Sequence, residues 1–133
     1  MLFRSAKAAE GEGADAISLI NTLLGMKIDI ETRKPVLYNN TGGLSGPAIL
    51  PVAVRMVWQV RNAVKIPILG MGGIFTGADA VEMMLAGADL VGIGTANITY
   101  PTAPLIVLDG IKQYLEAHKI SSVTELSGKV ELH

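Results

Sequence analysis

The sequence contains no cysteine, which excludes disulfide bridges, thiolate metal sites and a cysteine nucleophile or base among these residues. It also lacks an excess of charge of either sign, because 11 basic residues oppose 12 acidic ones. This balance argues against a nucleic-acid groove or an acidic tail. No window approaches the roughly 18 apolar residues of a membrane span, and no apolar signal-peptide core follows Met1. We therefore expect a cytoplasmic protein that acts on a small molecule.

Short apolar runs are the most informative feature that the sequence does have. The chain has 133 residues, half of them apolar, which is enough to bury one core and form a single domain. Apolar runs cover residues 16–20, 66–71 and 90–93, each bounded by glycine, proline or polar residues. Gly13-Ala14-Asp15 and Gly87-Ala88-Asp89 precede the first and third runs as a weak internal repeat. Such runs are typical of buried parallel strands that each follow a helix.

Two helical patterns separate these predicted strands. The first has a polar side, where Arg55, Gln59 and Arg61 are expected to face water, and an apolar stripe formed by Ala53, Met56, Val57, Val60 and Val64. The second begins at a predicted capping box of Thr76 and Asp79 and ends at Gly87.

A third helical pattern follows the last apolar run. It begins at Pro104, and its expected apolar stripe consists of Leu105, Leu108, Ile111 and Leu115. After Lys119 we expect a short tail, in which Val123 and Leu126 dock. The alternation of helices and strands along most of the chain predicts an α/β fold with parallel strands joined by right-handed crossovers.

One connection interrupts this alternation. From Leu23 to Gly46 the chain shows no helical period, and Met26, Ile28 and Ile30 alternate with polar residues before a polar turn at 31–34. The pattern predicts a β-hairpin carried on a long βα loop over residues 23–46. Long βα loops of barrels lie on the C-terminal face, where active sites form.

Glycine-rich turns follow two of the predicted strands. Gly70-Met71-Gly72-Gly73 ends one strand, and Gly92-Ile93-Gly94-Thr95 ends the next. Glycine at either place alone is more often plain turn geometry, but two such turns at neighbouring strand ends favour a phosphate cradle of backbone N–H groups. In barrels that task is typical of the loops after strands seven and eight.

Other polar features have a structural and a functional interpretation. The loop Thr41–Ala48 is either a flexible linker or a shaped loop on the same face as the glycine turns. Asn21 suits the edge of a polar heterocycle, although asparagine at a strand end is often a turn former. His118 and His133 lie near helix and chain ends and have no partner at metal-ligand spacing, so we expect no metal site.

The order of these motifs resembles a known family over roughly residues 6–119. Ser18-Leu19-Ile20-Asn21-Thr22, Gly42-Gly43-Leu44-Ser45-Gly46-Pro47-Ala48, Gly70-Met71-Gly72-Gly73-Ile74 and Gly94-Thr95-Ala96-Asn97 are similar to motifs of dihydroorotate dehydrogenases. The form of the second motif resembles the catalytic subunit of the NAD-linked bacterial type. It also resembles the pyrimidine-reducing barrel of dihydropyrimidine dehydrogenases, which is the alternative.

The resemblance implies an FMN-containing (β/α)₈ barrel that oxidises dihydroorotate to orotate in pyrimidine (UMP) biosynthesis. It implies that hydride passes to flavin N5, and that electrons then reach NAD through a partner subunit with an iron–sulfur cluster and FAD. It also implies roles for residues of this chain: Ile20 and Gly46 at the flavin ring, Gly72, Gly73, Gly94 and Thr95 at its phosphate, and Asn21 and Thr22 at the orotate.

A complete barrel of this family has eight strands and about 250 residues, whereas this chain resembles the part with strands six, seven and eight. The family's cysteine base and flavin-contacting lysine belong to earlier strands, so we assign no catalytic residue here. Three functions remain open: an incomplete dihydroorotate dehydrogenase with little activity alone, a non-catalytic FMN- or phosphate-binding half-barrel, and a structural half-barrel. Unpaired strand edges favour a homo-oligomer.

Overall fold

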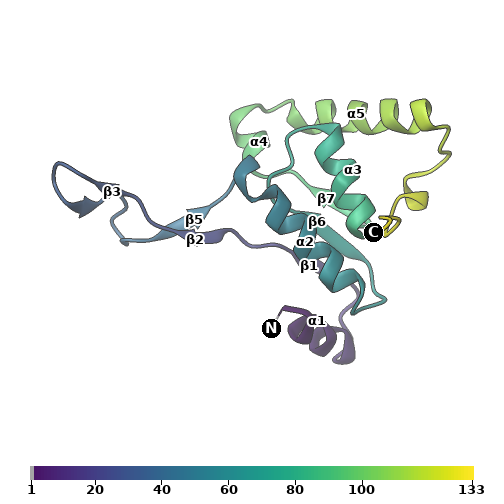
Figure 1. Cartoon of the computed structure of the whole chain (residues 1–133), viewed down its shortest axis with the longest axis horizontal. Helices are drawn as coiled ribbons and strands as arrows, with labels where there is room; N and C mark the ends of the chain where they lie inside the picture. The colour runs from purple at the N-terminus through teal and green to yellow at the C-terminus, as the bar shows by residue number, and fades with distance from the viewer. Residues whose placement is uncertain (1) are drawn as a thin grey trace.

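A computed structural model describes residues 2–133, so Met1, which the expected single domain 1–133 includes, lies outside the described residues. Helices and strands alternate along most of the chain (Figure 1). Their order is α1 (Leu2–Gly11), β1 (Ile17–Leu19), β2 (Leu23–Gly25), β3 (Ile28–Asp29), β4 (Lys34–Pro35), β5 (Gly42–Leu44), the 3₁₀ helix η1 (Pro47–Ile49), α2 (Leu50–Arg61), β6 (Ile68–Met71), α3 (Gly77–Ala86), β7 (Leu90–Gly92), α4 (Thr95–Thr99), α5 (Ala103–His118) and the 3₁₀ helix η2 (Val123–Glu125).

A three-stranded parallel sheet lies at the centre of the fold, in the order β1-β6-β7. Gly70 in the middle strand aligns with Leu19 of β1 on one side and with Val91 of β7 on the other. Between β1 and β6 the chain passes through α2, and between β6 and β7 it passes through α3. The predicted α/β fold with parallel strands is therefore confirmed.

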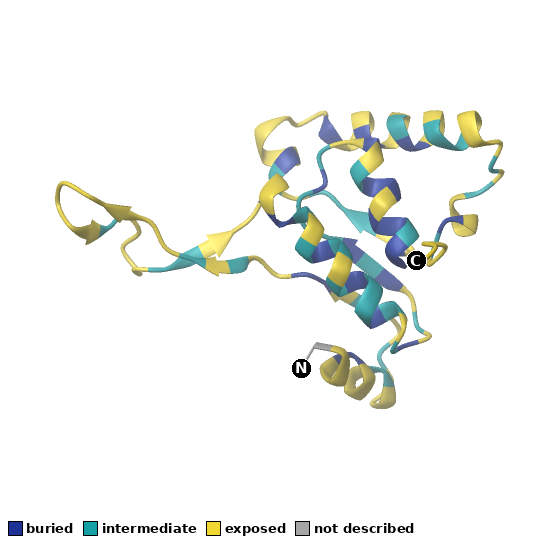
Figure 2. Ribbon diagram, in the orientation of Figure 1, coloured by how far each residue is buried: buried dark blue, intermediate teal, exposed yellow. Residues whose placement is uncertain are grey.

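The hydrophobic core lies between this sheet and the helices α2 and α3. Ile68 of β6, Val57 of α2 and Met83 of α3 are fully buried, and Figure 2 shows the buried residues concentrated on the facing sides of these elements. Strand and helix approach closely because Gly70 has no side chain: a Cβ there would lie 2.8 Å from Cγ of Met83. Burial of such side chains is the main favourable contribution to folding.

The opposite face of the sheet is open within the described chain. Side chains alternate between the faces of a strand, so Leu69 points away from the helices that bury Ile68. Leu69 aligns with Ser18 on one side and Leu90 on the other. Ser18 is exposed and Leu90 is 64% exposed. In a closed barrel this face would be the interior.

Helix α3 has the ends that the sequence predicts. Thr76 and Asp79 form a capping box, in which the Thr76 side chain accepts from Asp79 N and the Asp79 side chain accepts from Thr76 N. Gly87 ends the helix with a φ of 128°. This value favours glycine, because a residue with a Cβ would meet steric hindrance there. These local signals fix where the chain turns towards β7.

The packing of α5 differs from the expected stripe. Its buried residues are Ala103, Val107 and Ile111, whereas Leu105 and Leu108 are exposed. The helix meets α3 where two glycines cross, and a Cβ on Gly77 would lie 2.5 Å from Cα of Gly110. This close approach of two backbones decides which side of α5 is buried. In the tail, Leu126 is buried as expected, but Val123 is exposed.

Arg61 was expected to face water, and this expectation is wrong. Its side chain is 24% exposed and forms a 2.8 Å ion pair with Asp89. Its guanidinium also donates to the backbone oxygens of Gly87 and Ile66, both at 3.0 Å. Asp89 in turn accepts from the Ile68 backbone N–H. Arg61 thus joins the end of α2 to the starts of β6 and β7.

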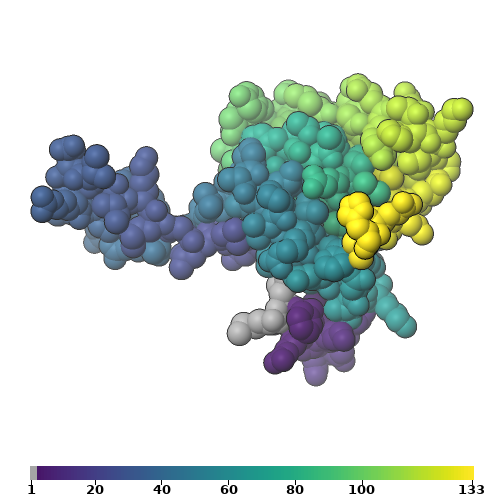
Figure 3. All heavy atoms as spheres, viewed as in Figure 1, coloured from purple at the N-terminus to yellow at the C-terminus, as the bar shows by residue number. Residues whose placement is uncertain are grey.

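Residues 23–44 form a projection that we call the arm. β2 pairs antiparallel with β5, and β3 pairs antiparallel with β4 further out. Figures 1 and 3 show the arm extending well away from the rest of the molecule. Several of its large apolar side chains are exposed, among them Leu24, Ile30 and Tyr38. Among the described residues, no helix is long and apolar enough to cross a membrane.

Candidate functional site

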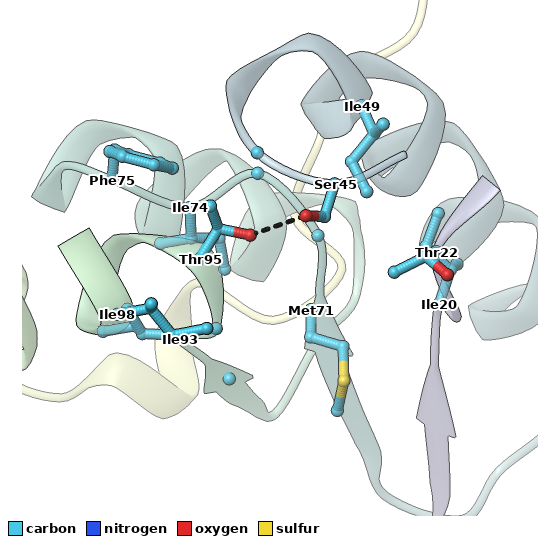
Figure 4. A pocket seen from close by; sticks show the side chains of 15 residues that line it. Ile20, Thr22, Ser45, Ile49, Met71, Ile74, Phe75, Ile93, Thr95 and Ile98 are labelled. Atoms are coloured by element: carbon cyan, nitrogen blue, oxygen red, sulfur yellow. Dashed lines mark hydrogen bonds between the residues drawn. The ribbon is translucent and has the colours of Figure 1, made fainter. Parts of the chain in front are cut away.

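A cavity of about 460 Å³ opens at the carboxyl ends of β1, β6 and β7. Because the three strands are parallel, the loops that follow them meet at one edge of the sheet, which is where ligands bind in α/β folds. Figure 4 shows side chains from all three loops around the opening. The residues lining the cavity are Ile20, Thr22, Ser45, Gly46, Ile49, Met71, Gly72, Gly73, Ile74, Phe75, Gly92, Ile93, Gly94, Thr95 and Ile98.

The first glycine turn lies against the loop that returns from the arm. Gly72 and Gly73 have φ values of 130° and 81°, which favour glycine. A Cβ on Gly73 would lie 2.7 Å from the backbone nitrogen of Leu50 and 2.9 Å from the carbonyl oxygen of Gly46. The turn is therefore fixed by backbone packing as well as by its own dihedral angles.

The second glycine turn has a different environment. Gly94 precedes the short helix α4, and a Cβ added to it would meet no atom within 4 Å. Packing therefore does not require glycine at this position. Because Gly94 has no side chain, its backbone is accessible at the wall of the cavity. Thr95 follows and contributes its hydroxyl to the same wall.

Backbone N–H groups at the two turns are unpaired in the part of the chain that the structure describes. Outside the regular helices and strands of residues 2–133, the N–H groups of Gly72, Gly73 and Gly94 donate no hydrogen bond. The N–H of Thr95, as the first residue of α4, is one that a helix leaves unpaired. Polar groups without a partner are available to a ligand, and several convergent N–H groups suit an anion such as phosphate.

The lining contains no side chain that can take up or release a proton near neutral pH. It consists of aliphatic residues, glycines, one methionine, one phenylalanine and the hydroxyls of Thr22, Ser45 and Thr95. The two carboxyl groups with lowered pKa values, Asp29 and Glu125, are exposed and lie elsewhere. Within residues 2–133 no group of three or more His, Cys, Asp or Glu side chains is arranged to hold a metal ion. The cavity can bind through dipoles and apolar contacts but supplies no acid or base.

The structure brings together the residues singled out in the sequence, with one exception. Ile20, Thr22, Gly46, Gly72, Gly73, Gly94 and Thr95 all line the cavity. Asn21 does not line it. Its Oδ1 accepts a hydrogen bond from the N–H of the adjacent residue Thr22 at 2.9 Å. His118 is remote and stacks on Tyr114 with ring centroids 4.0 Å apart.

Sequence reasoning missed several residues of the cavity. Ile49 and Phe75 line it from η1 and from the loop after β6. Ser45 accepts a 2.9 Å hydrogen bond from the Thr95 hydroxyl, and the two residues are 50 positions apart in the chain. Ser45 lies within the glycine-rich loop already noted, but no local pattern in the sequence connects it to Thr95.

Comparison with known proteins identifies relatives of the chain. A dihydroorotate dehydrogenase family model matches residues 2–117. The chain is 62% identical over 125 residues to the dihydroorotate dehydrogenase B (NAD(+)) catalytic subunit of Alkaliphilus oremlandii, which covers 94% of this chain and 41% of the relative. It is 58% identical over 127 residues to the protein of the same name from Parabacteroides distasonis, covering 96% of this chain and 42% of that relative.

A solved structure gives the same result for the fold. The crystal structure of a dihydroorotate dehydrogenase from Eimeria tenella, in complex with ferulenol, superposes with a TM-score of 0.80 and 27% sequence identity. The match covers 96% of this chain and 34% of that one. The α/β fold is thus part of a TIM barrel, and the chain spans about two fifths of the length of the curated relatives.

The resemblance seen in the sequence motifs, including that to the NAD-linked type, is confirmed by these matches. With a family model matching most of its length and relatives near 60% identity, the chain belongs to the dihydroorotate dehydrogenase family.

Proposed function

We propose that this chain provides the FMN-phosphate side of the site of a flavin-dependent enzyme that oxidises dihydroorotate to orotate in pyrimidine biosynthesis. The observation that carries the proposal is that Gly72, Gly73 and Gly94 line one cavity and that their backbone N–H groups have no acceptor among the described residues. The cavity lies at the carboxyl ends of neighbouring parallel strands, where barrel enzymes bind phosphate. Family membership supplies the substrate and the reaction class.

The residues present fit a phosphate group. Gly94 leaves open space at the wall, whereas the Gly73 turn is held rigidly by Leu50 and Gly46. We assign the phosphate to the N–H groups of Gly72, Gly73, Gly94 and Thr95. A rigid set of N–H dipoles binds an anion without the cost of reorganising flexible side chains.

The ring system is assigned to the apolar part of the cavity. Ile20 is buried at the end of β1, and Gly46 follows the arm with a φ of 92°. Met71, at the end of β6, also faces the opening (Figure 4). These residues would cover the flavin on one side and exclude water from it. When bound, FMN accepts a hydride from the substrate.

Asn21 and Thr22 are assigned to the substrate. The Thr22 hydroxyl lies at the cavity wall, while Asn21 is exposed and its amide oxygen is already engaged by Thr22 N. That hydrogen bond leaves the amide NH₂ as a donor for a carboxylate or ring carbonyl. The proton on the substrate carbon needs a base within hydrogen-bond reach, and no lining residue of this chain provides one.

A partner subunit follows from the similarity to the dihydroorotate dehydrogenase B catalytic subunits. The matched relatives are named as a catalytic subunit, so we propose a second subunit with an iron–sulfur cluster and FAD that passes electrons to NAD. We also propose a cytoplasmic location.

We further propose that copies of the chain associate. In the described sheet β1 and β7 each pair on one side only, and Leu90 on the open face is 64% exposed. Unpaired strand edges and exposed apolar faces favour pairing with another chain. Sedimentation velocity over a range of concentrations tests this, and a monomer at every concentration would refute it.

A chimaeric barrel tests the proposed function most directly. The segment of the Alkaliphilus oremlandii subunit that matches this chain is replaced by the chain itself. We expect the chimaera to bind FMN and to be reduced by dihydroorotate under anaerobic conditions, whereas the chain alone shows negligible turnover. A chimaera that folds and binds FMN without being reduced by dihydroorotate would favour a non-catalytic binding role instead. One that is reduced by dihydropyrimidines rather than dihydroorotate would favour the dihydropyrimidine dehydrogenase type.

A further inference from the structure

A side-chain hydrogen bond closes the cavity wall between two distant segments. The Thr95 hydroxyl donates to Oγ of Ser45 at 2.9 Å, and Figure 4 shows this contact among the side chains that line the cavity. Ser45 stands between β5, the last strand of the arm, and η1. Thr95 begins α4, directly after the second glycine turn. The bond therefore connects the base of the arm to the turn after β7.

We propose that Ser45 is a positioning residue, which acts through Thr95 to set the phosphate-binding turn at Gly94-Thr95. This inference rests on the proposed assignment of phosphate to that turn and names a residue that sets its geometry. Ser45 holds the hydroxyl of Thr95 in one direction, and so fixes the side-chain rotamer and the first residue of α4.

The turn at Gly94 has few other restraints, which is why one hydrogen bond matters there. A Cβ on Gly94 would find no neighbour within 4 Å, so the turn is not wedged by packing as Gly73 is. The nearby backbone bonds that Gly94 accepts, from Asn97 N and Ile98 N, all lie within its own turn and α4. Ser45 supplies a restraint from a different segment of the chain.

The direction of this hydrogen bond leaves a second donor free. Because Thr95 donates, the Ser45 oxygen accepts, and the hydroxyl proton of Ser45 remains available to the cavity. Both residues line the cavity. A phosphate group bound at this wall removes water from the pair and strengthens the bond. The contribution of Ser45 should therefore be larger in the ligand-bound protein than in the free one.

Ser45→Ala and Thr95→Val test the proposal, each removing one partner of the bond. The probes are FMN and riboflavin, which has the same ring system without the phosphate, titrated by flavin fluorescence. We expect Ser45→Ala to weaken FMN binding about 3- to 10-fold, the range of one lost hydrogen bond, and to leave riboflavin binding unchanged. The thermal unfolding midpoint of the free chain should not move.

The double variant separates positioning from a general structural effect. If both residues act through one bond, Ser45→Ala combined with Thr95→Val should weaken FMN binding no more than Thr95→Val alone. Ser45→Thr retains the hydroxyl and should restore most of the affinity. Thr41→Ala serves as the matched control, because it removes a hydroxyl from the same loop. Within residues 2–133 the Thr41 hydroxyl makes no side-chain hydrogen bond.

Outcomes of these titrations distinguish this inference from the function on which it rests. Wild-type chain that binds FMN no better than riboflavin would overturn the phosphate assignment itself. Wild-type chain that prefers FMN, with Ser45→Ala unchanged or with additive effects in the double variant, would overturn only the role of Ser45. Equal losses of FMN and riboflavin binding would likewise overturn it, since the effect would not be directed at the phosphate.

Discussion

Two glycines that line the cavity, one from each glycine turn, should respond differently to the same substitution. Gly73→Ala places a Cβ at 2.7 Å from Leu50 N and 2.9 Å from the Gly46 carbonyl oxygen, at a residue with a φ of 81°. Gly94→Ala places a Cβ in open space. Because only the Cβ of Gly73→Ala clashes, comparing the two variants separates a loss of folding stability from a loss of FMN binding.

The magnitudes follow from these surroundings. A left-handed φ costs an L-residue about 1–2 kcal/mol, and an overpacked site adds about 1–3 kcal/mol. Gly73→Ala should therefore lower the free energy of unfolding by about 2–5 kcal/mol. Gly94→Ala has no clash, so it should lower the free energy of unfolding by less than Gly73→Ala does, the remaining cost coming from a backbone conformation (φ −100°, ψ −91°) outside the regions that L-residues favour. Its methyl group nevertheless projects at the wall where phosphate is assigned, and FMN affinity should fall.

Urea unfolding followed by circular dichroism measures the first quantity, and FMN fluorescence titration measures the second. The bulkier Gly94→Val should abolish FMN binding while it lowers the free energy of unfolding by less than Gly73→Ala does. Wild-type stability in Gly73→Ala would refute the close packing of that turn. Undiminished FMN affinity in Gly94→Val would refute the assignment of the phosphate to this wall.

Further substitutions test the framework around the site. Arg61→Met leaves Asp89 without its 2.8 Å partner and should lower stability by about 1–3 kcal/mol, more than the exposed Arg55→Met, as urea unfolding would show. Gly77→Ala inserts a Cβ at 2.5 Å from Gly110 and should lower the unfolding midpoint, whereas an unchanged midpoint would contradict the contact between α3 and α5. The pKa of Asp29 is lowered by hydrogen bonds from the backbone N–H groups of Glu31 and Thr32. Its stabilisation of the arm turn is present above the usual value of 3.8 and is lost as the pH falls through the lower folded value. Carboxyl NMR shifts should show this low midpoint, and a midpoint at or above 3.8 would contradict it.

Local patterns in the sequence were enough to predict the strands of the central sheet. The apolar runs 66–71 and 90–93 contain the strands β6 and β7, because glycine, proline and polar residues mark where a short buried strand begins and ends. The capping box of Thr76 and the end of α3 at Gly87 were likewise readable, since each depends on residues within one helical turn.

Features that depend on distant segments were not readable. α5 is apolar around much of its circumference, so periodicity could not choose between the predicted stripe with Leu105 and the buried side with Val107. That choice is made by the crossing of Gly77 and Gly110. The sequence pattern predicts a solvent-exposed Arg61, because the partner of its side chain, Asp89, lies 28 residues further along the chain.

Much of the candidate site could be located from its motifs, because glycine turns after strands are local. What the motifs could not give is the geometry between them. Asn21 stands beside Thr22 in the sequence but lies outside the cavity lining, and Ser45 meets Thr95 only in the folded chain. The tertiary contact, rather than the motif, identifies Ser45 as part of the wall.

The central claim is that the N–H groups of the two glycine turns hold the phosphate of FMN. Two-dimensional ¹H–¹⁵N NMR of labelled chain reports on these groups one at a time. Saturable shifts of the amide resonances of Gly72, Gly73, Gly94 and Thr95 are predicted on addition of FMN, with much smaller shifts on addition of riboflavin. Shifts that cluster elsewhere on the chain, or that are the same for both compounds, would contradict the account.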